Sequence, residues 1–283
     1  MKFTGTIRFW GIAALSLALA SPAFTSDADL NSPFDLGASV VPVSSATLNI
    51  PATRARMSHE LALQVHDARA KRQARELGEY MDTTVIEAEL PQTSQKGVYQ
   101  LRRMYTAPKS LAFKAVNFVG DGFVKTNVIA RLLQSEVDHA KTSDNSIAIT
   151  TANYKFSYKG IEEVEGQQPV HVYQVKPRHN RVGLFKGKVY LDVYTGAMRH
   201  AEGTMVKSPS FFVKNIQFSQ DYIDVAGFDM VSHIHSTADA RIIGKTVVDI
   251  THRDLQARSL DELQASSPET QPTVQTVSLS SDR

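Results

Sequence analysis

The chain has 283 residues, no cysteine, and 31 Lys and Arg residues against 29 Asp and Glu residues. The lack of cysteine excludes disulfide bonds, and the balanced charge without a Lys/Arg cluster excludes a nucleic-acid-binding protein. A chain of about 260 residues buries roughly 70–75% of its unfolded surface, so it builds a core without cross-links.

The first 23 residues have the pattern of a secretory signal peptide. Lys2 and Arg8 come before an apolar run from Phe9 to Ala20, which is too short to span a bilayer stably. Small residues between 18 and 23 offer cleavage sites. We therefore expect a mature chain that starts at Ser21 or Phe24, is soluble in the periplasm, and balances 29 basic against 29 acidic residues.

Two polar segments flank the expected domain, which covers residues 53–255. Residues 24–52 are rich in Ser, Pro, Asp and Ala and predict a flexible linker. Residues 256–283 are rich in Ser, Thr and Gln and predict a disordered tail, with room for a short helix at Leu260–Gln264. Neither segment has enough large apolar side chains to offset the entropy lost on ordering.

Two segments of the domain have helical patterns. The stretch Ala55–Tyr80 is densely charged and predicts a helix whose apolar stripe contains Met57, Leu61, Val65, Ala68 and Leu77. The second predicted helix, Lys125–Ala140, follows a Gly-Asp-Gly turn. Its expected apolar face is formed by Val128, Ile129, Leu132, Leu133, Val137 and Ala140.

The rest of the domain has the alternation of apolar and polar residues that is typical of strands. Strands are expected at 82–90, 98–106 and 111–119, and the chain is almost purely β from Ile147 onward. The fold class is mainly β with two helices (α+β), with about 10–11 antiparallel strands. Short strands at regular spacing favour a barrel or a strongly curved sheet, and parallel βαβ units are excluded because the helices do not alternate with the strands.

The segment Phe185–Gly203, FKGKVYLDVYTGAMRHAEG, predicts a β-hairpin. Thr195 and Gly196 supply the turn, where Gly196 is free to adopt a positive φ angle. Two roles remain open for Asp192: it accepts a hydrogen bond from a turn N–H group, or it pairs across the strands with Arg199.

His233 and His235 form the sharpest candidate for chemistry. They occupy alternate positions of one strand and so point to the same face, where a third ligand such as His200, Glu202 or Asp239 would complete a zinc site. The reading in which both histidines face solvent without a metal is favoured. No nucleophile elbow, phosphate-binding loop or dinucleotide fingerprint is present, which favours a non-catalytic protein without a cofactor.

Four segments together resemble the outer-membrane lipoprotein-sorting proteins, the LolA/LolB-like superfamily with its RseB and bacterial lipid-carrier relatives. They are NYKFSYKGIEEVEGQQPVHVYQVKPR, the hairpin above, FFVKNIQFSQDYIDVAGFDMVSHIHS and IIGKTVVDITHRDL. The hairpin carries the pattern in Gly187, Asp192, Thr195, Gly196 and Arg199. The resemblance implies a half-open β-barrel whose helices plug the concave face, a cavity for acyl chains, and no catalytic residues.

If the sheet is curved, the apolar faces of its strands should line the concave side and meet the second helix. The expected ligand-binding residues are Ile129, Leu132, Leu133, Val137, Tyr154, Phe156, Tyr158, Val189, Leu191, Val193, Phe212, Ile216 and Phe218. The predicted function is a monomeric periplasmic carrier or binding protein for acyl chains or lipoproteins, with transient membrane contact. Two alternatives stay open: an RseB-like sensor or adaptor for an envelope protein, and a metal hydrolase built on His233 and His235.

Overall fold

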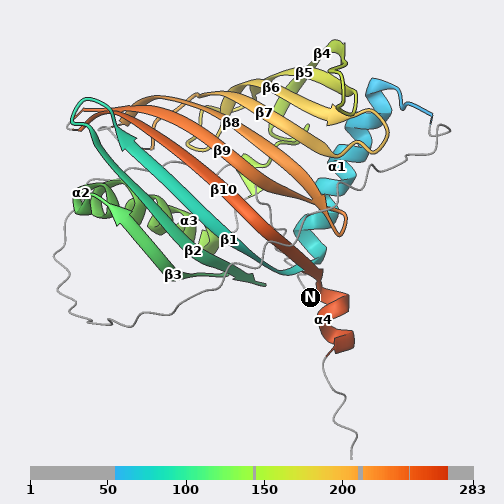
Figure 1. Cartoon of the computed structure of the whole chain (residues 1–283). Coiled ribbons are helices and arrows are strands. Elements are labelled where there is room, and N and C mark those ends of the chain that lie inside the picture. Colours follow the sequence, from blue (N-terminus) through green and yellow to red (C-terminus); the bar gives the residue numbers. More distant parts are fainter. Residues whose placement is uncertain (1–54, 143–144, 210–212, 242, 267–283) are drawn as a thin grey trace, which may run out of the picture.

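The computed structural model of the protein describes residues 55–142, 145–209, 213–241 and 243–266. These residues form one antiparallel sheet of ten strands in the order β3-β2-β1-β10-β9-β8-β7-β6-β5-β4. The sheet is curved and remains open, with β3 and β4 as its edges (Figure 1). The prediction of about ten antiparallel strands in an open, curved sheet is confirmed, whereas the predicted signal peptide and the linker at 24–52 lie outside the described residues.

The strands follow the predicted positions and are mostly longer. They are β1 (Leu77–Leu90), β2 (Gln95–Thr106), β3 (Ser110–Gly120), β4 (Tyr154–Glu162), β5 (Val170–Pro177), β6 (Phe185–Asp192), β7 (Met198–Met205), β8 (Val213–Val225), β9 (Phe228–Ala240) and β10 (Gly244–Ser259). The helical elements are α1 (His59–Glu76), α2 (Gly122–Val124), the π-helical turn η1 (Lys125–Ile129), α3 (Ala130–Thr142), the 3₁₀ turn η2 (Asn145–Ile147) and α4 (Leu260–Ser266).

The strand order explains why helices cross one face of the sheet. Strands β3 and β4 follow each other in sequence but lie at opposite edges. The connection between them therefore has to cross the sheet, and it contains α2, η1, α3 and η2. We call the face that carries α1 and α3 the inner face and the opposite one the outer face.

Three clusters of buried apolar side chains lie on the inner face. The first joins Val124, Val128, Ile129 and Leu132 of the helical crossing to side chains of β1, β2 and β8–β10. The second is centred on β4–β8 and contains Tyr154, Tyr173, Phe185, Val189 and Leu191. The third contains Leu77, Tyr80, Tyr105, Leu111, Phe228 and Met230. Because strand side chains alternate in direction, the same strands present mostly polar side chains on the outer face.

Helix α1 buries a different stripe from the predicted one. Leu61 is 47% exposed and Ala68 is also exposed. The buried residues of the helix are Ala62, His66, Ala70, Gln73 and Ala74. The prediction was wrong because α1 docks through small and hydrogen-bonding side chains: His66 Nε2 lies 2.7 Å from the Ile149 carbonyl oxygen, and Gln73 bonds the backbone of β9.

The folded chain extends past Leu255, the predicted end of the domain. Strand β10 continues to Ser259 and is followed by α4. Leu255 and Ala257 pack against the third cluster, which orders the end of β10. Among the described residues, no helix has the length and apolar character needed to cross a membrane.

Candidate functional site

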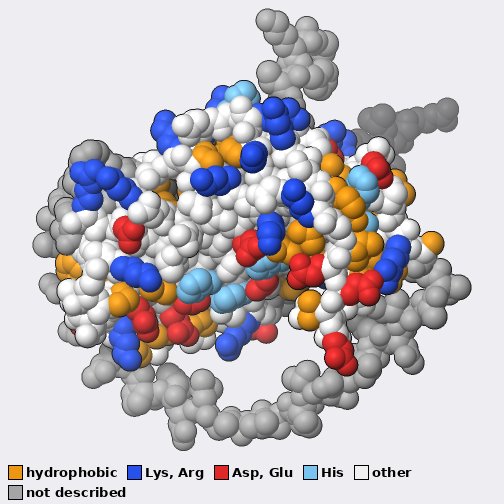
Figure 2. Space-filling model, turned by 90° about the horizontal axis from the view of Figure 1, so that it is seen from above, with side chains coloured by type: hydrophobic (Ala, Val, Ile, Leu, Met, Phe, Trp, Pro, Cys, Tyr) orange, Lys and Arg blue, Asp and Glu red, His pale blue; other side chains and the backbone are white. Residues whose placement is uncertain are grey.

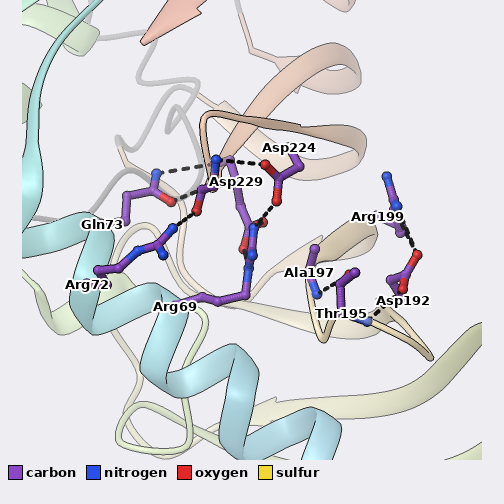
Figure 3. Close-up of polar contacts among 10 residues, drawn as sticks. Arg69, Arg72, Gln73, Asp192, Thr195, Ala197, Arg199, Asp224 and Asp229 are labelled. Atoms are coloured by element: carbon purple, nitrogen blue, oxygen red, sulfur yellow. Dashed lines mark hydrogen bonds and ion pairs between the residues drawn. The ribbon is translucent and has the colours of Figure 1, made fainter. Parts of the chain in front are cut away.

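Helix α1 is fastened to the β8–β9 hairpin by charged and polar side chains (Figure 3). The Arg69 guanidinium lies between the carboxylates of Asp224 and Asp229, 2.7 Å from Asp229 Oδ1. Gln73 accepts a hydrogen bond from the Asp229 N–H group and donates one to its carbonyl oxygen. Arg72 donates to the Gly227 carbonyl oxygen. These contacts fix one half of α1 to the end of the hairpin.

The turn of the β6–β7 hairpin packs against the other half of α1. Asp192 takes both roles that its position left open: Oδ1 accepts from the N–H groups of Tyr194 and Thr195, and Oδ2 accepts from the Arg199 guanidinium at 2.8 Å (Figure 3). Burial alone would raise the pKa of Asp192, but the hydrogen bonds from Arg199 and the turn outweigh it and lower that pKa. Gly196 then adopts a φ angle of +63° directly beneath α1.

Gly196→Ala is expected to lower the free energy of unfolding by about 1–3 kcal/mol, because a Cβ atom would add left-handed strain and press on α1. That atom would lie 2.9 Å from the Ala62 carbonyl oxygen and 3.0 Å from the Val65 side chain. Gly166→Ala is the matched control, since Gly166 has a φ angle of +75° and open space around it. Urea denaturation of both variants measures the free energy of unfolding. Equal losses of this free energy in the two variants would contradict close packing of α1 against Gly196.

The helical crossing packs four aliphatic side chains into the first cluster. Val124, Val128, Ile129 and Leu132 are at most 1% exposed within the first cluster. The Lys125 ammonium lies over the rings of Tyr99 and Phe118, 5.6 and 5.1 Å from their centroids. The π-helical turn η1 precedes α3, and such turns are frequent at functional sites.

A buried polar network lies on the inner face under α3. Asp82 of β1 is directly opposite Arg103 of β2, and Arg103 Nη2 lies 2.8 Å from Asp82 Oδ2. His252 of β10 lies opposite Thr84, with its Nδ1 atom 3.2 Å from Asp82 Oδ1. Glu136 of α3 approaches Arg103 with 4.0 Å between Oε2 and Nη1. The network therefore joins the floor of the inner face to the helix that covers it.

Burial dominates the pKa values of this network. It raises the pKa of Glu136, and the charge of Arg103 opposes that rise only in part. Burial also lowers the pKa of His252 to about 4, with the Arg103 charge acting in the same direction. Burial alone would raise the pKa of Asp82, but the hydrogen bond to His252 and the charge of Arg103 lower it. At neutral pH the Arg103–Asp82 ion pair thus lies beside an uncharged imidazole.

None of the residues of this network was predicted from the sequence as part of a site. One signal was available, because Arg103 alternates with Leu101 and Tyr105 and so shares their buried face. Asp82 occupies the same kind of position between Tyr80 and Thr84. A charged side chain on the apolar face of a predicted strand indicates a buried ion pair.

The structure distributes the predicted ligand-binding residues among the clusters rather than collecting them around one space. Ile129, Leu132, Leu133 and Ile216 belong to the first cluster and Val137 packs on the third. Tyr154, Phe156, Val189, Leu191 and Phe218 belong to the second. Val193 is fully buried outside the clusters, Tyr158 is 37% exposed, and Phe212 lies outside the described residues. Fully buried members such as Leu191 pack against other protein side chains in this structure.

His233 and His235 point to the outer face, where they pair with carboxylates. His235 Nδ1 lies 2.8 Å from Asp249 Oδ1, and the His233 ring lies between Asp221 and Asp249 at 3.5 and 3.7 Å. His200 also bonds Asp221. The other two suggested ligands have different partners: Asp239 accepts from Asn215, and Glu202 accepts from Tyr190. In the described part of the chain, no group of three His, Asp or Glu side chains is arranged to hold a metal ion.

These features define a class of protein: a single open antiparallel sheet whose inner, apolar face is crossed by helices. The sequence matches no protein-family model and no curated protein. Among solved structures, the chain is similar to a LolA superfamily protein from Nitrosomonas europaea, with 11% identity, a TM-score of 0.35, and coverage of 72% of this chain and 96% of that one. A DUF1329 family protein from Desulfovibrio piger gives 8% identity and a TM-score of 0.37, with 70% and 92% covered.

An outer membrane lipoprotein-sorting protein domain from Vibrio parahaemolyticus gives 12% identity and a TM-score of 0.34, again with 70% and 92% covered. At these identities and TM-scores no ligand or partner is transferred, and the function proposed below rests on the residues of this chain.

Proposed function

We propose that the protein is a periplasmic carrier or binding protein for acyl chains of lipids or lipoproteins, which it holds on the inner face beneath α3. The supporting observation is the contrast between the two helices on that face. Ion pairs and hydrogen bonds fasten α1 to the β8–β9 hairpin. The helical crossing covers the first cluster with four aliphatic side chains, and Glu136 of α3 lies 4.0 Å from Arg103 of β2.

Movement of α3 away from the sheet would open a binding site for an acyl chain. Displacing the crossing uncovers the apolar side chains of β1, β2 and β8–β10, and an acyl chain replaces the aliphatic contacts that are lost. Burying an acyl chain is worth about 0.8 kcal/mol per CH₂ group, so sixteen carbons supply on the order of 12 kcal/mol before costs. An acyl chain that leaves a bilayer loses a similar free energy there, so the inner face has to supply comparable burial for a lipid to be extracted.

Exposed apolar side chains lie near the β3 edge of the sheet, where the helical crossing begins. Val98 of β2 and Val119 of β3 face each other in the ladder and are 40% and 65% exposed. Val116 and Phe123 are 55% and 43% exposed. We place the transient membrane contact at this edge, next to the helix that has to move.

Leu133→Asn is expected to weaken the uptake of a fluorescent fatty acyl probe by about tenfold, since an unpaired amide beside the acyl chain costs about 1–3 kcal/mol. Leu133 is only partly buried at the margin of the first cluster, so the melting temperature should fall by a few degrees. Leu61→Asn, the same change at an exposed position of α1, is the matched control and should leave uptake unchanged.

Failure of the wild-type protein to take up the probe, or equal uptake by the wild type and Leu133→Asn, would contradict this function. Native mass spectrometry of protein purified from the cell envelope separates the alternatives. Co-purified lipid supports the carrier, a protein partner without lipid supports the sensor or adaptor, and stoichiometric zinc supports the hydrolase.

A further inference from the structure

The outer face of the sheet contains a polar depression of about 510 Å³ that the proposed acyl carrier does not use. It lies over β5–β9, and we call it the outer trough. One side is formed by Lys188, Glu202 and Ser219, the other by Lys186, Thr204 and Gln217. Between the two rows, Gly187 faces Gly203 in the ladder, and a Cβ atom on either glycine would collide with the opposite strand. The trough has the size of a small-ligand site.

The charges of the trough favour an anion. Glu202 is already engaged, because it accepts a hydrogen bond from the Tyr190 hydroxyl at 2.9 Å and pairs with Lys188 at 3.6 Å. Lys186 is exposed and has no acidic partner at ion-pair distance among the described residues. The trough therefore has one ammonium group, that of Lys186, which no carboxylate of the described residues neutralises.

A row of lysines extends this positive charge from the trough toward the β4 edge. Lys155 of β4 is directly opposite Lys176 of β5, and both are exposed. Lys176 and Lys186 in turn occupy the position next to the Val175–Gly187 pair, on the same outer face. Like charges opposite each other in a sheet are destabilising, and a bound anion would relieve the repulsion. Figure 2 shows lysine and arginine side chains spaced around a largely uncoloured area of the surface.

Four of the remaining lining residues have hydrogen-bond donors that suit oxygen atoms. Thr204, Ser219 and Thr237 contribute hydroxyl groups, and Gln217 contributes an amide. Lysine binds phosphate as a point charge, and hydroxyl and amide groups complete the hydrogen bonds to phosphate oxygens and to neighbouring alcohol groups.

We infer that the outer trough binds a phosphate ester that carries free hydroxyl groups, with Lys186 as the central cation and Thr204 beside it. The same chemistry occurs in a soluble polyol phosphate and in a glycerol-containing phospholipid headgroup. The site is on the opposite face from the proposed acyl site, so either can exist without the other.

The test is a titration of the purified protein with glycerol 3-phosphate by calorimetry, together with co-sedimentation on phosphatidylglycerol and phosphatidylcholine vesicles. Lys186→Gln is expected to weaken binding by about tenfold, which corresponds to about 1.4 kcal/mol. Thr204→Val, which leaves the charge unchanged, should also weaken it. Lys159→Gln removes the same charge from an exposed position outside the trough and should bind like the wild type.

Binding of glycerol 3-phosphate with this ranking of variants supports a soluble ligand. Binding only to phosphatidylglycerol vesicles, with the same ranking, supports a lipid headgroup. Circular dichroism confirms that each variant is folded. The proposal is wrong if neither probe binds, if Lys159→Gln weakens binding as much as Lys186→Gln, or if Lys186→Gln has no effect.

Discussion

Arg103→Met is expected to lower the free energy of unfolding by about 3–5 kcal/mol, because it leaves the Asp82 carboxylate buried without its cation. The Asp82 side chain is 0% exposed and that of Arg103 is 8% exposed, so water cannot replace the lost partner. The variant also loses the contact of the guanidinium with the Tyr80 ring, whose centroid is 5.1 Å away. Urea denaturation at pH 7 gives the measurement.

Arg102→Met is the matched control, since Arg102 is the preceding residue of β2 and is exposed. A surface substitution of this kind changes stability by about 0.5 kcal/mol or less. The double variant Arg103→Met with Asp82→Leu should recover much of the loss, because a buried ion pair can be replaced by apolar side chains. If Arg103→Met were as stable as Arg102→Met, the network would not contribute to folding as we infer.

Acidification from pH 6.5 to pH 4 is expected to remove about 3 kcal/mol of stability through His252. Burial and the Arg103 charge lower the pKa of His252 to about 4, against an ordinary value of 6.5. Between these two values the unfolded chain binds a proton that the folded chain does not. The stabilising contribution is therefore complete above pH 6.5 and is lost as the pH falls toward 4.

Glu136 acts in the opposite direction over part of this range, because burial raises its pKa and the folded chain takes up that proton first. The comparison with His252→Asn isolates the histidine, since both proteins keep Glu136. The variant should be less stable at pH 7 and should show a shallower loss of stability from pH 6.5 to 5. His179→Asn changes an exposed histidine and should keep the slope of the wild type. Equal slopes for wild type and His252→Asn would contradict the prediction.

The strands were the most predictable part of the fold. Alternation in β1, β2 and β6 is a local pattern, and it placed each strand within a few residues of its observed bounds. The β6–β7 hairpin could be predicted equally well, because Asp192, Gly196 and Arg199 lie within eight residues of one another. The buried face of α1 could not be predicted in this way, because it depends on Asp229 of the β8–β9 hairpin, which bonds Arg69 and Gln73 from 160 and 156 residues later.

The candidate sites also contain features that local sequence predicts and features that depend on distant residues. The apolar face of the second helix was visible in its sequence, and Ile129 and Leu132 of that face are buried in the first cluster. The network around Asp82 was not, since Asp82 meets Arg103 across 21 residues and His252 across 170. The outer trough likewise needs five neighbouring strands in register before its lysines and hydroxyl groups surround one space.

By itself, the sequence determined the class of the fold, a run of about ten strands, the second helix and the hairpin turn, because each depends on side chains close together along the chain. Only the tertiary structure decided that β3 and β4 lie at opposite edges, that α3 crosses the inner face between them, and which charges are buried beneath it. The physical reason is that burial and ion pairing depend on the partner, and the partners here come from distant strands whose order no local pattern specifies.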